Sequence, residues 1–146
     1  MSDKQLPFFV YGTLRVGQPN FRLVKGAVKE YALDVPLVNH VLVTSPRAAF
    51  PFMIKHAQVP DNLRCLLAED TPVIGDLLWI KPKEYDRVSS GLDALEGVPD
   101  LYERHVVQVN EYEAWAYVAG SYVTQEIVRS PFSPTNNWND HEQPKL

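Results

Sequence analysis

Proline is the residue that most constrains the fold of this chain, because twelve prolines are spread along its 146 residues. A proline inside a helix removes a backbone hydrogen bond and clashes with the preceding turn. This density therefore excludes long helices and favours short strands joined by turns. The clearest helix is predicted over Pro82–Leu95, where the proline stands in the first turn and costs no hydrogen bond. One or two further helical turns are expected after Pro19.

Short runs of apolar and β-branched residues between these breaks predict strands. The predicted strands are Phe8–Tyr11, Glu30–Asp34, Val38–Thr44, Phe52–Ile54, Val73–Ile80, Tyr102–Val109 and Ala114–Val118. Gly75, inside one of them, indicates a bulge or the close approach of another part of the backbone. Because strands outnumber helices and do not alternate strictly with them, the sequence predicts an α+β fold built on a small barrel or a strongly curved sheet.

The length and the net charge of the chain limit the classes of protein to which it can belong. A chain of 146 residues corresponds to one domain. We expect this domain to span residues 1–146, with residues 122–146 as an extended C-terminal tail. A net charge of −4 without a basic stripe argues against nucleic acid as a partner. The polar start Met1–Gln5 is too short for a signal peptide, and no apolar run approaches a membrane span. A cytoplasmic protein of undetermined oligomeric state is therefore expected.

Glu96 is the first candidate for chemistry, because it ends the predicted helix on the edge of the apolar stripe. Successive helical residues differ by about 100°, so Glu96 lies only about 20° from Tyr85, which belongs to that stripe. Partial burial and the negative end of the helix dipole should both raise the pKa of its carboxyl. A general base or acid needs a pKa near the working pH. An ion pair with Arg104 or a capping role is the alternative, and helix geometry alone slightly favours that alternative.

The second candidate is the segment that follows the first strand. Gly12 ends this strand, so the N–H groups of the next residues are free to bind a carboxylate or a developing oxyanion. The segment is not a phosphate-binding loop, since no Gly-Lys-Ser/Thr follows. A plain turn is the commoner explanation and is favoured several to one for this segment taken alone. The four histidines and the single Cys65 show no metal-ligand spacing, so no metal site is predicted.

Four segments together resemble the γ-glutamylcyclotransferase-like family, also called AIG2-like. The run Phe9–Arg15, followed by Gly17–Asn20, is similar to the opening of the family. Leu92–Arg104 resembles its Leu-Asp-x-x-Glu-Gly segment with the following Tyr-x-Arg. Gly75–Leu78 resembles the Gly-Glu-Leu-Tyr strand, and Ala116–Val118 the last core strand. The pair formed by Tyr-Gly-Thr-Leu and the later Glu-Gly is rather specific, although either half alone is weak.

The subgroup that the chain looks closest to is γ-glutamylaminecyclotransferase, because of its Gly-Gln-Pro-Asn run and its Pro99–Arg104 run. Two departures stand out. Asn20-Phe21 replaces the frequent Asn-His, and Gly75-Asp76 replaces the frequent Gly-Glu. Neither changes the expected catalytic carboxylate, so they bear on substrate detail rather than on the chemistry.

The resemblance implies a small closed or nearly closed β-barrel with flanking short helices and a cavity at one end. It also implies that the α-amine of a γ-glutamyl amide attacks the γ-carbonyl, which releases 5-oxoproline and a free amine or amino acid. Glu96 would be the catalytic residue. Substrate binding would fall to Tyr102 and to the loop residues Tyr11, Gly12, Thr13 and Leu14. Neither a metal nor an organic cofactor is needed.

Two other functions remain open from the sequence. The first is a non-catalytic module on the same fold that binds a carboxylate-bearing metabolite. Glu96 argues against that module, because a carboxylate in the pocket does not help to bind an acidic ligand. The second is a hydrolase or acyltransferase that uses the same loop. The sequence does not identify the amine that leaves.

Overall fold

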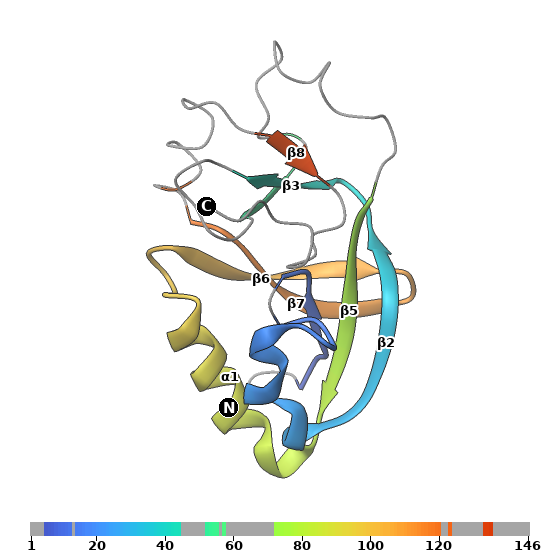
Figure 1. Ribbon diagram of the computed structural model, residues 1–146, viewed down its shortest axis with the longest axis vertical. Coiled ribbons are helices and arrows are strands. Elements are labelled where there is room, and N and C mark those ends of the chain that lie inside the picture. Colours follow the sequence, from blue (N-terminus) through green and yellow to red (C-terminus); the bar gives the residue numbers. More distant parts are fainter. Residues whose placement is uncertain are drawn as a thin grey trace.

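A computed structural model describes residues 5–12, 14–44, 52–55, 57, 72–120, 123 and 133–135. Its strands form two sheets, one of five strands in the order β2-β5-β1-β7-β6 and one of three in the order β4-β3-β8 (Figure 1). The larger sheet contains β1 (Phe8–Val10), β2 (Val28–Leu37), β5 (Val73–Ile80), β6 (Tyr102–Val109) and β7 (Tyr112–Ala119). The smaller sheet contains β3 (His40–Thr44), β4 (Phe52–Lys55) and β8 (Ser133–Thr135).

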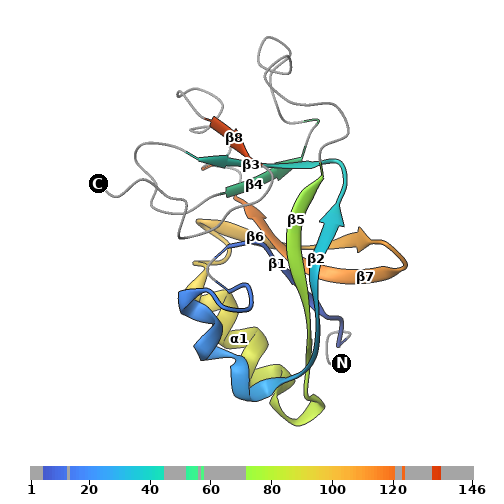
Figure 2. The same cartoon turned by 45° about the vertical axis from the view of Figure 1, so that its right-hand side comes forward.

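Among the described residues, the sheets are accompanied by the α-helix α1 and by the short 3-10 turns η1, η2 and η5. The helix α1 covers Tyr85–Leu95 and is preceded by the turn η5 (Pro82–Glu84), so together they occupy the predicted Pro82–Leu95. The turns η1 (Pro19–Leu23) and η2 (Lys25–Ala27) follow the predicted entry at Pro19. Figures 1 and 2 show these two turns side by side with α1 at one end of the molecule, away from the smaller sheet. Within the described residues, no helix is long and apolar enough to cross a membrane.

The central strand of the larger sheet is β1, which pairs antiparallel with β5 and parallel with β7. All three of its residues are buried, as expected for a strand covered on both faces. Phe8 and Val10 pack in a core cluster with Tyr85, Val88 and Leu92 of α1. Phe9 points to the other face, where a second cluster contains Leu42 and Met53 of the smaller sheet. The carboxyl end of β1 therefore emerges between two cores.

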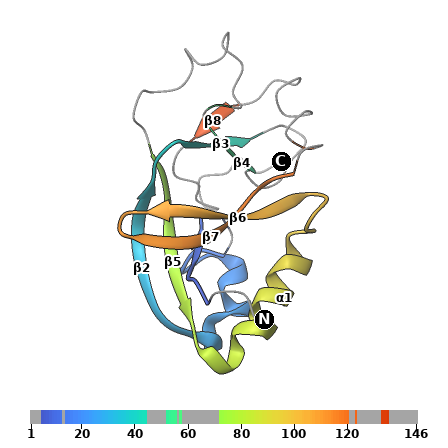
Figure 3. The same ribbon diagram turned by 180° about the vertical axis from the view of Figure 1, so that it is seen from behind.

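The larger sheet is strongly curved. The β6–β7 hairpin runs across the direction of the long β2–β5 pair (Figures 1 and 3). Hydrogen-bonded pairing among the described strands runs from β2 to β6 without closing on itself. The described residues thus form an α+β arrangement, with a mixed five-stranded sheet and the helix α1. The closed barrel that the resemblance implied stays a prediction.

Several predicted strand boundaries differ from the observed ones, and turn geometry explains three of them. β2 runs on to Leu37 rather than ending at Asp34, and β3 begins at His40 rather than at Val38. Asn39, with φ of 65°, supports a tight two-residue turn between them. Asn110, with φ of 54°, does the same between β6 and β7 and lets β7 begin at Tyr112. The proline within β2 is tolerated because β2 is an edge strand.

Gly75 confirms the predicted close approach. A side chain at this position would place its Cβ 2.5 Å from the carbonyl oxygen of Val10 and 2.6 Å from Cζ of Phe9. Both distances are far below ordinary van der Waals contact, so β5 can lie this close to β1 only with glycine here. The predicted tail contributes β8, which pairs antiparallel with β3.

Candidate functional site

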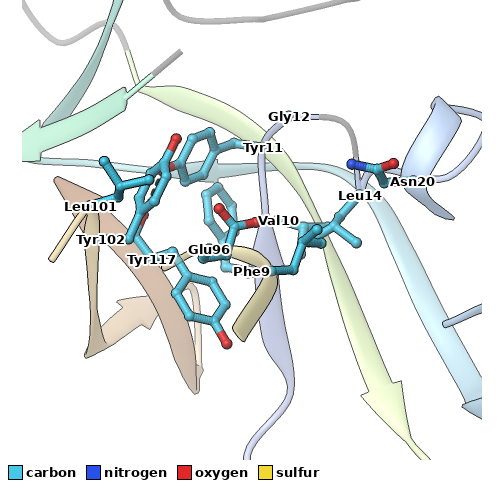
Figure 4. Close-up of a pocket in the computed structure, with 11 residues that line it drawn as sticks. Phe9, Val10, Tyr11, Gly12, Leu14, Asn20, Glu96, Leu101, Tyr102 and Tyr117 are labelled. Carbon is cyan, nitrogen blue, oxygen red and sulfur yellow. Dashed lines mark hydrogen bonds between the residues drawn. The ribbon is translucent and has the colours of Figure 1, made fainter. Parts of the chain in front are cut away.

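A cavity of about 160 Å³ opens at the carboxyl end of β1, beside the end of α1 and the start of β6 (Figure 4). A cavity of this size accepts a molecule about as large as benzene. Its described lining consists of Phe9, Val10, Tyr11, Gly12, Leu14, Asn20, Leu95, Glu96, Leu101, Tyr102 and Tyr117. The lining thus combines aliphatic and aromatic side chains with a single carboxylate.

Glu96 stands at the point where α1 ends. Its N–H donates to the carbonyl oxygen of Leu92 at 2.9 Å, which completes the last turn of the helix. Gly97 follows with φ of 66°, the left-handed conformation that commonly stops a helix and that glycine adopts at no cost. Leu101 then folds back over Gly97, since a Cβ on that glycine would lie 3.1 Å from Cδ1 of Leu101. These local features direct the Glu96 side chain into the cavity (Figure 4).

The carboxyl of Glu96 is half-buried among apolar and aromatic groups. Burial raises its pKa from the ordinary value of 4.5 to about 7, because the charged form loses solvation. The sequence also predicted that the pKa of Glu96 is raised, and burial is the cause in the structure. A carboxyl with this pKa exchanges protons readily near neutral pH.

Three tyrosines surround this carboxylate. The pKa values of Tyr11, Tyr102 and Tyr117 are all raised, first by burial and in each case also by the negative charge of Glu96. All three phenols therefore stay protonated at neutral pH and can act as hydrogen-bond donors. The Tyr11 hydroxyl donates to the carbonyl oxygen of Tyr117 at 2.6 Å, which joins the end of β1 to β7.

Tyr117 and Arg104 hold the last turn of α1 through Asp93. The Tyr117 hydroxyl donates to Oδ1 of Asp93 at 2.6 Å, and Nε of Arg104 lies 3.5 Å from the same oxygen. The Arg104 guanidinium also donates to Oγ of Ser89 and lies 4.6 Å from the ring centre of Trp115. Arg104 thus forms its ion pair with Asp93, one helical turn before Glu96. Arg104 is the residue that the sequence analysis named as the alternative ion-pair partner of Glu96.

The loop after β1, which we call the β1 loop (Gly12 and Leu14–Gln18), forms the opposite wall. Thr13, predicted to bind substrate, lies outside the described residues. The Arg15 N–H donates to the carbonyl oxygen of Gly12 at 3.0 Å, and the Gln18 N–H to that of Arg15 at 2.9 Å. These two turns bring Gly12 and Leu14 to the cavity, where the sequence had predicted a substrate-binding loop.

A buried carboxylate on β5 holds the β1 loop in place. Asp76 is only 1% exposed. Its Oδ2 accepts from the Val16 N–H at 2.9 Å, and its Oδ1 from the Asp34 N–H at 3.1 Å and from Nη2 of Arg15 at 3.2 Å. Asp76 therefore joins the β1 loop, β5 and the irregular middle of β2.

Five of the six residues predicted for the site line one cavity: Tyr11, Gly12, Leu14, Glu96 and Tyr102. Sequence reasoning did not assign Asn20, Leu101 or Tyr117 to it. Asn20 was part of the Gly-Gln-Pro-Asn run that resembles the family, without a role in the site, and Tyr117 was part of a predicted core strand. Among the residues that the structure describes, no cluster of three His, Cys, Asp or Glu side chains could hold a metal ion. The arrangement can hold a small polar molecule and move a proton at Glu96.

Comparison with known proteins relates the chain to one protein family. The family described as Gamma-glutamyl cyclotransferase, AIG2-like matches residues 8–140. No curated protein matches the sequence. An AIG2-like protein from Mus musculus has a similar structure, with a TM-score of 0.65 and 21% identity over 95% of this chain and 90% of that chain.

Two further solved structures are similar. An uncharacterised protein from Pyrococcus horikoshii has a TM-score of 0.53 and 17% identity, covering 80% of this chain and 79% of that one. Allophanate hydrolase from Kluyveromyces lactis has a TM-score of 0.62 and 11% identity, covering 94% of this chain and 21% of that one. At these identities the likeness concerns the fold alone.

Proposed function

Because this chain belongs to the Gamma-glutamyl cyclotransferase, AIG2-like family, we propose that it cyclises γ-glutamyl amides and releases 5-oxoproline. The observation that carries the proposal is the position of Glu96, a carboxylate with a pKa of about 7 that faces the β1 loop across a small cavity. We also propose the setting that the sequence predicted, a single-domain cytoplasmic enzyme whose sheet closes toward a barrel.

The reaction moves protons from one nitrogen to another. The attacking nitrogen begins as the α-ammonium and ends as the lactam N–H, so it loses two protons, the first of them before it attacks the γ-carbonyl carbon. The leaving nitrogen begins as an amide N–H and ends as a free ammonium, so it gains two protons as its C–N bond breaks and the amine departs. Glu96 takes each proton as a carboxylate and returns it as a carboxylic acid, so the residue is regenerated in each turnover. Ring closure needs no external nucleophile and no cofactor.

The remaining lining residues hold the substrate folded for this attack. We expect the backbone N–H groups of Gly12 and Leu14, which line the cavity, to donate to the developing negative charge on the carbonyl oxygen. The aromatic rings of Tyr11 and Tyr102 confine the flexible glutamyl chain, and confinement in a reactive geometry supplies much of the rate of an intramolecular reaction. The protonated Tyr102 phenol is a further donor for the substrate.

Glu96→Gln is the decisive variant, because glutamine keeps the shape of the side chain but cannot accept the proton. We expect the rate of 5-oxoproline release from a panel of γ-glutamyl amines and γ-glutamyl amino acids to fall ~10²–10⁴-fold or more. The matched control is Glu103→Gln. Glu103 is a carboxylate on β6 that pairs with His105 at 3.0 Å and is absent from the described cavity lining.

The control should cyclise substrate at nearly the wild-type rate. Near-normal turnover by Glu96→Gln would eliminate this mechanism. If the wild-type protein bound 5-oxoproline but turned over no member of the panel, the binding module would replace the enzyme as the function.

A further inference from the structure

The described lining of the cavity contains a single side chain with an N–H donor, Asn20. The other polar side chains of that described lining are the three tyrosine hydroxyls and the Glu96 carboxylate, and no lysine, arginine or histidine is among them. Figure 4 shows the Asn20 carboxamide on the side of Gly12 and Leu14, whereas Leu101 and Tyr102 lie on the other side of Glu96. The cavity therefore has an amide end and an aromatic end, with the carboxylate between them.

Asn20 is held at this end by the packing of its own segment. It is half-buried in η1, where the Phe21 N–H donates to the carbonyl oxygen of Gln18 at 3.1 Å. Val24, one turn later, is 4% exposed and belongs to the same core cluster as Leu14. The short helix and the β1 loop are thus packed together, so the carboxamide has a fixed place relative to the loop.

The chemistry of a γ-glutamyl group fits a cavity with an amide end, a central carboxylate and an aromatic end. Its α-carbon carries an ammonium and a carboxylate, and the ammonium must reach Glu96 to lose its proton. The carboxylate then needs N–H donors nearby. A lysine or arginine would supply them, but a cation beside Glu96 would lower the pKa of that carboxyl and weaken it as a base. A neutral carboxamide donates hydrogen bonds without that effect.

We propose that Asn20 recognises the α-carboxylate of the substrate and so restricts the enzyme to γ-glutamyl compounds in which this carboxylate is free. The inference rests on the proposed cyclotransferase function and adds to it the orientation of the substrate. The α-carboxylate lies at the Asn20 end, the α-amine lies at Glu96, and the leaving amine lies toward Leu101 and Tyr102.

Paired substrates test this directly. One is a γ-glutamyl amine with a free α-carboxylate, and the other is the same compound with an α-carboxamide in its place. The wild-type protein should prefer the carboxylate substrate in kcat/KM. Hydrogen bonds to charged groups contribute about 1.5–3 kcal/mol, so Asn20→Ala should reduce this preference about tenfold or more. Asn20→Asp should reverse it, because it places one carboxylate against another.

Arg22→Gln is the matched control, since Arg22 is exposed on the same short helix and absent from the described cavity lining. It should leave the preference unchanged. A purely structural role of Asn20 would lower kcat/KM for both substrates equally, so an unchanged ratio in Asn20→Ala and Asn20→Asp would overturn the inference. The near-isosteric Asn20→Asp keeps the test valid if Asn20→Ala does not fold.

A binding measurement separates this inference from the proposed function. Calorimetry with 5-oxoproline and with its carboxamide compares the same two groups without any turnover. If the wild-type protein cyclised neither substrate, the proposed function would fail, and the binding comparison alone would decide the role of Asn20. Preference for 5-oxoproline that is lost in Asn20→Asp supports the role. Equal affinity for the two ligands, or binding of neither, refutes it.

Discussion

Asp76 is the buried carboxylate that ties the β1 loop to the sheet, and Asp76→Asn measures how strongly it does so. Asparagine has nearly the same volume, so no cavity forms. Its side chain offers one acceptor oxygen where the carboxylate offers two. In the folded protein these two oxygens accept from the Arg15 guanidinium and from the backbone N–H groups of Val16 and Asp34. The variant must therefore lose the charge and place an N–H₂ group against at least one donor.

The expected cost follows from the burial of these groups. Removing one partner of a buried ion pair typically costs about 3–5 kcal/mol, and leaving a buried donor unsatisfied costs about 1–3 kcal/mol. These contributions share partners and do not simply add. Since Arg15 keeps its pair with Asp34 at 2.6 Å, we expect Asp76→Asn to lower the free energy of unfolding by about 3–4 kcal/mol. For a chain of this size that corresponds to a fall in Tm of roughly 6–16 °C.

Urea unfolding at neutral pH provides the assay, with the stability change read from the midpoint at constant slope. Asp34→Asn is the matched control, because it removes the other carboxylate that pairs with the same arginine. The Asp34 side chain is 71% exposed, so that pair should contribute less than about 1 kcal/mol. Asparagine also tolerates the positive φ of 54° at this position. Equal small effects of the two variants would refute the argument from burial.

Two further predictions follow from Glu96 and Gly75. The folded-state pKa of Glu96, about 7, lies above its ordinary value of 4.5, so ionisation of this group destabilises the folded state as pH rises through 7. Glu96→Gln should therefore stabilise the protein at pH 8.5 by up to about 3 kcal/mol and hardly at pH 4.5. A stability difference between variant and wild type that is independent of pH would contradict this. The kcat/KM of the wild-type protein should fall below about pH 7, where Glu96 becomes protonated. Gly75→Ala should lower Tm more than Gly91→Ala. A Cβ at Gly75 would lie 2.5 Å from the carbonyl oxygen of Val10, whereas nothing lies within 4 Å of a Cβ at Gly91. Equal melting temperatures of the two variants would contradict the close approach of β5 to β1.

The parts of the site that the sequence predicted are those with local signals. Glu96 is placed by the apolar stripe of α1 and by the glycine that stops the helix, and both features lie within a few turns of it. The loop at Gly12 follows from a short apolar strand that ends at a glycine. Each of these signals depends on neighbouring residues, so no knowledge of the rest of the fold was needed to read them.

The parts that were missed depend on contacts between distant residues. β2 was predicted to end at Asp34, whose positive φ would normally end a strand. It continues because the Asp34 N–H donates to Asp76, 42 positions away, where the β2–β5 register shifts. Asn20 reaches the cavity only because η1 packs beside the β1 loop. Neither pairing leaves a trace in the spacing of residues along the chain.

The position of the cavity follows from the central strand. β1 is too short to extend past the two clusters that cover it, since Phe8 and Val10 belong to one and Phe9 to the other. Where the strand stops, hydrogen bonds to Asp76 hold the loop that follows. Glu96 shares a cavity with members of both clusters, Tyr11 from one and Tyr102 from the other. A carboxylate at this junction is removed from water by both cores, and burial there raises its pKa to about 7. The packing that stabilises β1 is therefore also what makes Glu96 a base of suitable strength, so substitutions at Phe9 or Val10 that loosen this junction should lower the pKa of Glu96 before they abolish folding.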